Sequence, residues 1–453
     1  MSGTTAGRPG SGSVARREVL ALAVPAFGAL VVEPLFLLTD TAIVGRLGTD
    51  PLAGLGVASA VLSTLVGLFV VLAYGTTATV SRQLGAGRLG PAFTVGVDGC
   101  WLALAVGAVT ASVGALSAPA VVSAFGVPPG VAAEAVAYLT VSMTGIPAML
   151  FVLAATGVLR GLQDTRTPLV VAVVGFTWNA VLSLVLVHGP GPAPALGIAG
   201  SAWGTVVAQT TMAVWLGVLV VRGARRHSAA LRPHAAGIAT AARAGVPLLL
   251  RTVTLRVALL VTVWVAAGTG GTSLAAHQVV FTVWTFGAFA LDAIAIAAQA
   301  LTGRSLGAGD VSAALGATAL MVRWGVGGGA VLGGLLAATS PLLPVVFSPV
   351  ADVRTGITAG LLVVGVTAPL AGYVFVLDGV LIGAGDGSYL ARAGVVALLA
   401  YLPLVAIVPL LGLRGTTGLV VLWLAFAGGY MAARAVTLGL RARSDRWLVL
   451  GAD

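Results

Sequence analysis

The sequence contains no lysine, and this absence excludes two kinds of chemistry. A P-loop needs a lysine on the nucleotide phosphates, so the chain does not hydrolyse ATP by that route. A lysine Schiff base is excluded for the same reason. The single cysteine, Cys100, excludes an intrachain disulfide and a cysteine metal cluster. We therefore predict neither an enzyme nor a resident cofactor or metal.

Charge is also scarce. Only 8% of the residues are charged, 58% are hydrophobic, and the mean hydropathy is +1.06. Apolar stretches of about 20 or more residues follow one another, and a soluble core could not absorb them. The sequence therefore predicts an all-α membrane protein with twelve transmembrane helices. The expected spans are 18–46, 52–82, 92–120, 131–159, 167–188, 197–221, 241–267, 274–302, 312–338, 356–383, 391–411 and 417–440.

The chain repeats itself at an offset of 222 residues. Leu84–Gly87 recurs as Leu306–Gly309, and Pro147 corresponds to Pro369 in the same ungapped register. Each unit holds six of the predicted spans, so the second unit enters the membrane from the same side as the first. The repeat is therefore parallel, an arrangement from which many secondary transporters are built, with the substrate path between the halves.

Arginine, which supplies all 24 basic residues, indicates the orientation. With the amino terminus inside, most arginines fall on the cytoplasmic side, whereas Arg46, Arg354 and Arg414 fall outside. We therefore predict a multi-pass protein of the bacterial plasma membrane with both termini cytoplasmic. The formal charge of +10 reflects this topology rather than nucleic-acid binding. The expected parts are a disordered tail (1–16), an N-lobe (17–221), a cytoplasmic linker (222–240), a C-lobe (241–440) and a cytoplasmic C-terminal tail (441–453).

The first span carries two acidic residues on one face. Glu33 and Asp40 are seven residues apart, which is two helical turns. Pro34 lies between them and removes a backbone hydrogen bond, which favours a bend. A charge at the bilayer centre costs about 2.5–3.5 kcal/mol on insertion scales, so Asp40 is interpreted as a functional acid that exchanges a proton or holds a cation. The alternative is a permanently protonated acid that only joins helices, and for Glu33 both interpretations stay open.

Other polar groups lie deep in neighbouring spans. Asn179, the only asparagine, is in the fifth span, with Ser183 one turn further on the same face, and Thr205 is in the sixth. With Asp40 they predict an oxygen-rich cation cage or a hydrogen-bond network around a protonated acid. The alternative is interhelical hydrogen bonding, worth under about 1 kcal/mol each. For the substrate cavity we expect Glu33, Trp178 and Gln209.

The second half carries a different set of charges. Asp292 and Asp378 lie in the eighth and tenth spans, and Arg251 and Arg256 lie in the seventh. Opposite charges inside membranes usually pair, which predicts a structural or gating ion-pair network, with a second coupling site as the alternative. At the repeat offset Asp378 corresponds to Thr156, so the halves are not chemically equivalent.

Several segments resemble one family of transporters. Residues 33–48, followed by 52–56, resemble the first-helix signature of the multidrug and toxic compound extrusion (MATE) family and are closest to its DinF branch. Residues 157–168, 274–278 and 292–299 also look like that branch. The resemblance covers residues from about 17 to 440, and the first-helix motif carries most of its specificity.

The resemblance implies two six-helix lobes in a V, with a central cavity that opens alternately to each side. Members of the family export organic cations and other amphiphiles in exchange for H⁺ or Na⁺. The family's coupling aspartate matches Asp40, and the asparagine of the same site matches Asn179. Some relatives carry a second acid where this chain has Ser183, a departure that favours protons. Sodium-type relatives of the NorM branch have a carboxylate near the position of Leu255 and Arg256, which argues against their second-lobe site.

We therefore expect a monomeric antiporter in the lipid bilayer that exports amphipathic or cationic small molecules in exchange for H⁺. No nucleic-acid partner is expected. One alternative is a Na⁺-coupled exporter of the same family. Another is a lipid-linked precursor flippase, which would need an arginine-lined cavity, whereas the sequence places only Arg251, Arg256 and Arg323 deep in the membrane. The third alternative is a membrane protein that transports nothing, such as a receptor or scaffold.

Overall fold

The computed structural model describes residues 11–189 and 195–452, except the side chains of residues 11–16 and of Glu33. All regular secondary structure within these ranges is helical, and these residues form no strand. Twelve helical segments are long and apolar enough to cross a membrane. The all-α membrane architecture predicted from hydropathy is thereby confirmed.

The described residues of the first half form seven helices, of which α2 and α3 together make one candidate span. They are α1 (Ser11–Val44), α2 (Thr49–Phe69), α3 (Val71–Gly85), α4 (Leu89–Ser123), α5 (Pro129–Gly161), α6 (Arg166–His188) and α7 (Gly197–Arg226).

The second half has the same plan with a divided last span, in which a π-helix joins α14 to α15. Its elements are α8 (Ala235–Gly268), α9 (Gly271–Gly307), α10 (Val311–Thr339), α11 (Leu343–Phe347), α12 (Ala351–Gly383), α13 (Gly387–Leu410), α14 (Gly415–Trp423), the π-helix η1 (Leu424–Tyr430), α15 (Met431–Ala442) and the 3-10 helix η2 (Asp445–Trp447).

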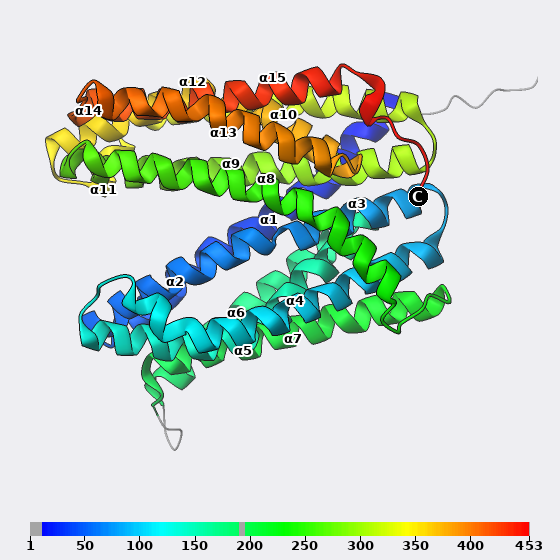
Figure 1. Cartoon of the computed structure of the whole chain (residues 1–453), viewed down its shortest axis with the longest axis horizontal. Helices are drawn as coiled ribbons and strands as arrows, with labels where there is room; N and C mark the ends of the chain where they lie inside the picture. The colour runs from blue at the N-terminus through cyan, green and yellow to red at the C-terminus, as the bar shows by residue number, and fades with distance from the viewer. Residues whose placement is uncertain (1–10, 190–194, 453) are drawn as a thin grey trace, which may run out of the picture.

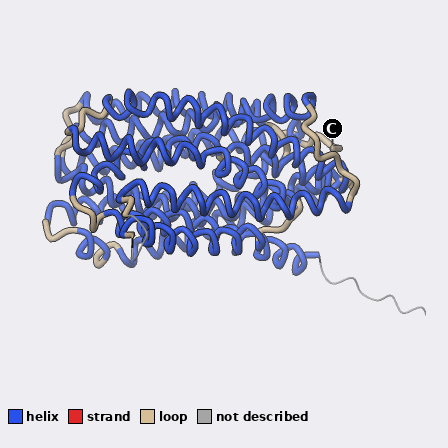
Figure 2. The backbone as a smooth tube through the Cα atoms, turned by 90° about the horizontal axis from the view of Figure 1, so that it is seen from below, coloured by secondary structure: helices blue, strands red, loops and turns tan. Residues whose placement is uncertain are grey.

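The two halves form two bundles. One buried apolar cluster fills most of the N-lobe, and a second fills the C-lobe. Figure 1 shows the bundles as two layers that converge at the end marked C and diverge toward the opposite end. Figure 2, the view from below, shows that the described residues are mostly helical, with short loops between the helices. Helix α1 lies between them, because it packs against α6 in one lobe and against α9 in the other.

The lobes touch where α3 meets α9. A Cβ atom at Gly85 would overlap the carbonyl oxygen of Arg304, and one at Gly307 would overlap the carbonyl oxygen of Arg82. These two contacts are equivalent under the 222-residue offset, so a pseudo-twofold axis passes between them. Glycine permits the approach because it has no Cβ. We call this region, residues 82–88 with 304–310, the joined end.

The predicted linker is shorter than its range of 222–240. Helix α7 continues to Arg226 and α8 begins at Ala235, so only residues 227–234 lie outside helices. Hydropathy marks the apolar part of a helix, whereas arginine and alanine also favour helix beyond the membrane.

The predicted disordered tail, 1–16, also overlaps a helix. Helix α1 already begins at Ser11, while residues 1–10 lie outside the described residues. The low hydropathy of this segment excludes it from a membrane span but does not exclude helix.

Candidate functional site

Asp40 lies near the end of α1 and is 2% exposed. The Ser201 hydroxyl on α7 donates a hydrogen bond to Asp40 Oδ1 at 2.5 Å. The Tyr138 hydroxyl on α5 donates to Asp40 Oδ2 at 2.8 Å. Both carboxyl oxygens therefore accept a hydrogen bond from a neighbouring helix, and the acid links α1 to two other helices of the N-lobe.

Asn179 joins the same cluster through α7. Its Nδ2 atom donates to Thr205 Oγ1 at 3.1 Å, and the Thr205 hydroxyl donates to the Ser201 carbonyl at 3.1 Å. Ser183 is fully buried and lies close to the Asp40 carboxyl. The structure thus brings together Asp40, Asn179, Ser183 and Thr205, four of the five residues that the sequence indicated for ion coupling. Their role in coupling stays a prediction.

Two members of the cluster, Tyr138 and Ser201, were missed from the sequence. Ser201 precedes Thr205 by one helical turn and so lies on the same face, which is a signal that could have identified it. Tyr138 had no comparable signal, because only the packing of α5 against α1 and α7 brings it to the acid. The side chain of Glu33 lies outside the described residues.

A cavity of about 250 Å³ lies inside the N-lobe next to this cluster. Its wall comes from α1, α2, α5, α6 and α7 and is mostly apolar. Tyr138 and Thr205 belong both to this wall and to the Asp40 cluster, and the other polar side chains of the wall are Ser59, Ser63, Ser142 and Gln209. Gln209 therefore lines a cavity of the N-lobe, whereas Trp178 is 44% exposed and is not among the described residues of this wall. The contact of Gln209 with substrate stays a prediction.

Gly204 holds α6 and α7 close together beside Ser183. A Cβ atom at Gly204 would lie 2.7 Å from Ser183 Oγ and 2.9 Å from its backbone nitrogen. We predict that Gly204→Ala separates the helices and destabilises the protein by about 1–3 kcal/mol, measured by thermal unfolding in detergent. Gly56→Ala is the control, because a Cβ there meets nothing within 4 Å and gains the same helix propensity. Equal stability of the two variants would contradict this packing argument.

The C-lobe has no comparable acid at the equivalent place. The 222-residue offset relates Asp40 to Thr262 and Asn179 to Tyr401. Thr262 Oγ1 and the Tyr401 hydroxyl hydrogen-bond at 2.6 Å, and Tyr401 packs edge-on against Phe426. A neutral pair among aromatic rings thus replaces the acid and amide, so the C-lobe does not repeat the polar cluster around Asp40.

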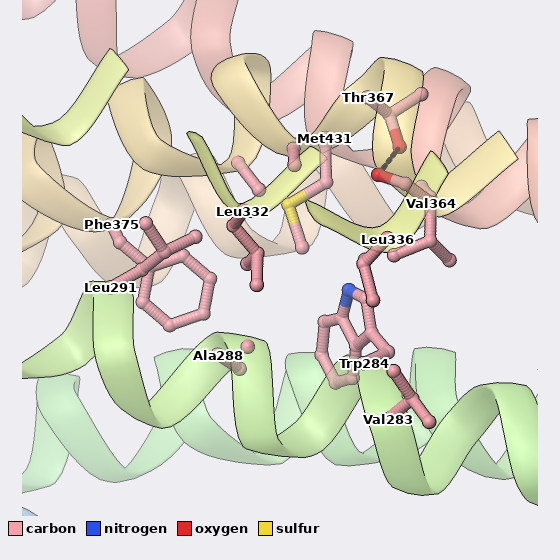
Figure 3. A pocket seen from close by; sticks show the side chains of 14 residues that line it. Val283, Trp284, Ala288, Leu291, Leu332, Leu336, Val364, Thr367, Phe375 and Met431 are labelled. Atoms are coloured by element: carbon pink, nitrogen blue, oxygen red, sulfur yellow. Dashed lines mark hydrogen bonds between the residues drawn. The ribbon is translucent and has the colours of Figure 1, made fainter. Parts of the chain in front are cut away.

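The apolar pocket inside the C-lobe is small. Figure 3 shows its wall, which includes Trp284, Phe375 and Met431, and its volume is about 10 Å³. Thr367 also lines this pocket, and its hydroxyl donates hydrogen bonds to the carbonyl oxygens of Val363 and Val364 in its own helix. This space is near the lower limit for a single water molecule, so it does not match the N-lobe cavity as a ligand site.

The predicted charge network divides into two parts. Within the C-lobe, Asp378 on α12 pairs with Arg251 on α8 and with Arg434 on α15, the latter at 2.5 Å. Across the lobes, the Tyr74 hydroxyl on α3 donates to Asp292 Oδ2 on α9 at 3.3 Å. The first part is internal to one lobe, whereas the second must change if the lobes separate at the joined end.

The remaining arginines are distributed differently from the prediction. Arg256 reaches across to the N-lobe and contacts Gly67 on α2. Arg323, which the sequence places deep in the membrane, lies in the middle of α10 with an exposed side chain that can extend along the helix surface toward the interface. Arg82, Arg160 and Arg434 are buried instead.

Comparisons with known proteins agree with this architecture. The family model MatE matches residues 25–185 and 247–407, two segments that are again 222 residues apart. The chain is 30% identical to the chloroplastic protein DETOXIFICATION 44 of Arabidopsis thaliana over 462 residues, covering 98% of this chain and 85% of that protein. It is 29% identical to the DNA damage-inducible protein F of Escherichia coli K12, covering 64% of each.

A solved structure has the same fold. A mutant of the Vibrio cholerae MATE transporter VcmN superimposes with a TM-score of 0.87 at 19% identity, covering 96% of this chain and 99% of that one. The likeness extends over both lobes.

Proposed function

We propose a proton-coupled export mechanism for this chain, which belongs to the MATE family of multidrug and toxic compound efflux transporters. Members of this family are membrane transporters and not enzymes, and they act on small molecules. Our proposal is that the chain exports amphipathic, cationic compounds in exchange for H⁺ by alternating access of the two lobes.

The observation that carries the proposal is the hydrogen bonding of Asp40. An ionised carboxylate only accepts hydrogen bonds, which matches the hydroxyl donors Tyr138 and Ser201 at its two oxygens. A protonated Asp40 would itself be a donor, so one of the two hydroxyls would have to turn to another acceptor. Protonation would therefore change the links between α1 and its neighbours α5 and α7, and a proton could shift the balance between two packings of α1.

The cavity suggests how substrate and proton compete. Tyr138 and Thr205 line the cavity and also belong to the Asp40 cluster, so a bound molecule would contact the groups that hold the acid. The mostly apolar wall suits an amphipathic compound, and the nearby carboxylate favours a cation when it is ionised. The described wall contains no arginine, which disfavours a flippase for pyrophosphate lipids.

The joined end supports alternating access. If both termini are cytoplasmic, as the arginine distribution predicts, the lobes meet on the cytoplasmic side and diverge outward (Figure 1). Proton binding from outside would then release substrate outward, and proton release toward the cytoplasm would permit reloading.

The test is export of a fluorescent cation from proteoliposomes under separately imposed pH and Na⁺ gradients. We expect export to follow the pH gradient and to ignore Na⁺. Exchange of one monovalent cation for one proton moves no net charge, so an imposed gradient of one pH unit, about 1.4 kcal/mol, supports about a tenfold cation gradient. Strict dependence of export on Na⁺ would show that the coupling ion is Na⁺ and not H⁺. Export that responds to neither gradient would overturn ion coupling and favour a flippase.

A further inference from the structure

The segment Val449–Ala452, which follows the 3-10 helix η2, lies at the joined end between the two lobes. The chain just before it is fixed to the C-lobe, because Trp447 is 1% exposed and belongs to the C-lobe apolar cluster. The Gly451 amide then donates to the carbonyl oxygen of Leu306, the penultimate residue of α9, at 3.1 Å. The segment is therefore anchored in the second lobe.

The N-lobe holds the same segment through two side chains of α3. Arg82 donates three hydrogen bonds, one each to the carbonyl oxygens of Val449 (2.5 Å), Gly451 (3.0 Å) and Ala384 (2.7 Å). Gln83 donates to the carbonyl oxygen of Ala452 at 3.0 Å. All four acceptors belong to the second half of the chain, and three of them lie in this segment.

The repeat provides a reciprocal contact. Arg304 is the counterpart of Arg82 at the 222-residue offset, and it reaches from the C-lobe to Gln163 and, at 3.8 Å, to Glu18 of the N-lobe. Arg304 binds side chains of the opposite lobe, whereas Arg82 binds backbone carbonyls. On one side of the pseudo-twofold axis, residues 449–452 thus provide partners for Arg82, and on the other side the side chains of Gln163 and Glu18 provide partners for Arg304.

We propose that residues 449–452 form a latch that holds the two lobes together at the joined end and must release before that end opens. Arg82 is 9% exposed in the closed arrangement. Separation of α3 from α9 and from the end of α12 breaks the three hydrogen bonds from Arg82 to the second half. Water would then solvate the freed guanidinium, which offsets part of the free energy of the lost hydrogen bonds. The latch rests on the proposed function, because only alternating access requires the joined end to open.

The latch uses backbone carbonyls, which makes its variants easy to distinguish. Leu450 is 48% exposed, and Leu450→Ala leaves the carbonyl acceptors in place, so this variant is the matched control. Gly451 has a φ of +98°, which an alanine adopts only with strain, so Gly451→Ala should weaken the latch. Arg82→Gln removes the donor that makes most of the contacts.

The experiment measures the distance between the lobes by double electron–electron resonance. Spin labels are placed at Leu89 on α4 and Ala313 on α10, two exposed positions on opposite lobes within a few residues of the joined end, in a Cys100→Ala background. The full chain is compared with a variant ending at Leu448 and with the three point variants. We expect Arg82→Gln and the shortened chain to raise the ratio of open to closed distances at least tenfold, equivalent to about 1.4 kcal/mol.

Gly451→Ala should give a smaller rise, and Leu450→Ala should match the unmodified sequence. Unchanged distance distributions in both Arg82→Gln and the shortened chain would overturn the latch, as would a shift in Leu450→Ala equal to theirs. The distances are measured without substrate or ion gradient, so the test of the latch does not depend on whether the protein exports a substrate. An unaltered distribution together with intact Asp40-dependent export would reject the latch alone.

Discussion

Asp40→Asn is expected to abolish proton-driven export while leaving the protein folded. The replacement keeps the size of the side chain and one oxygen acceptor, so at least one of the hydrogen bonds from Tyr138 and Ser201 can persist. It removes the only carboxyl group of the cluster, which is the group that we propose exchanges the proton. The cation gradient of about tenfold that one pH unit supports should therefore fall to none.

The measurement is cation export from proteoliposomes under an imposed pH gradient, with protein folding checked by size-exclusion chromatography. Ser183→Ala is the informative partner variant, because it removes a hydroxyl close to Asp40 but leaves the acid. It should retain proton-driven export at a reduced rate. If Asp40→Asn exports as well as the unmodified protein, Asp40 is a structural acid and the coupling group lies elsewhere.

The sequence was sufficient to find Asp40 and Asn179, because a polar side chain within an apolar span stands out without any tertiary information. It was not sufficient to find Tyr138, because the chain has six tyrosines and nothing in the sequence distinguishes this one. Tyr138 matters only through its contact with an acid 98 residues away, and such a contact depends on how α5 packs. Periodicity along one helix carries no information about which neighbouring helix it meets.

The same limit applies to the fold. Hydropathy and the 222-residue repeat predicted twelve spans in two units, since both signals are local or internal to the sequence. The role of Gly85 and Gly307 at the lobe contact was not predicted, although they belong to the motif that revealed the repeat. The docking of residues 449–452 left no side-chain pattern, because its hydrogen bonds are made by backbone carbonyls.

Asp378→Leu is expected to destabilise the protein more than Gly204→Ala or any single change at the Asp40 cluster. Asp378 is 4% exposed and balances the charges of two arginines, Arg251 and Arg434. Its removal leaves both guanidinium groups buried without their carboxylate, and breaking a buried pair typically costs about 3–5 kcal/mol. The measurement is thermal unfolding in detergent. Glu18→Gln is the control, because the side chains of Glu18 and its partner Arg304 are 42% and 41% exposed and such pairs contribute under about 1 kcal/mol.

A triple variant separates a structural role of this cluster from a second coupling site. Replacing Asp378 by leucine and both Arg251 and Arg434 by methionine removes all three charges together, and well-packed apolar groups often substitute for a buried ion pair without loss of stability. We expect stability to return to within about 2 kcal/mol of the unmodified protein. We also expect proton-driven export to persist, because the cluster lies within the C-lobe, whereas Asp40, the proposed coupling acid, lies in the N-lobe. A triple variant that is stable but exports nothing would show instead that Asp378 takes part in coupling, and the C-lobe would then hold a second ion-dependent step.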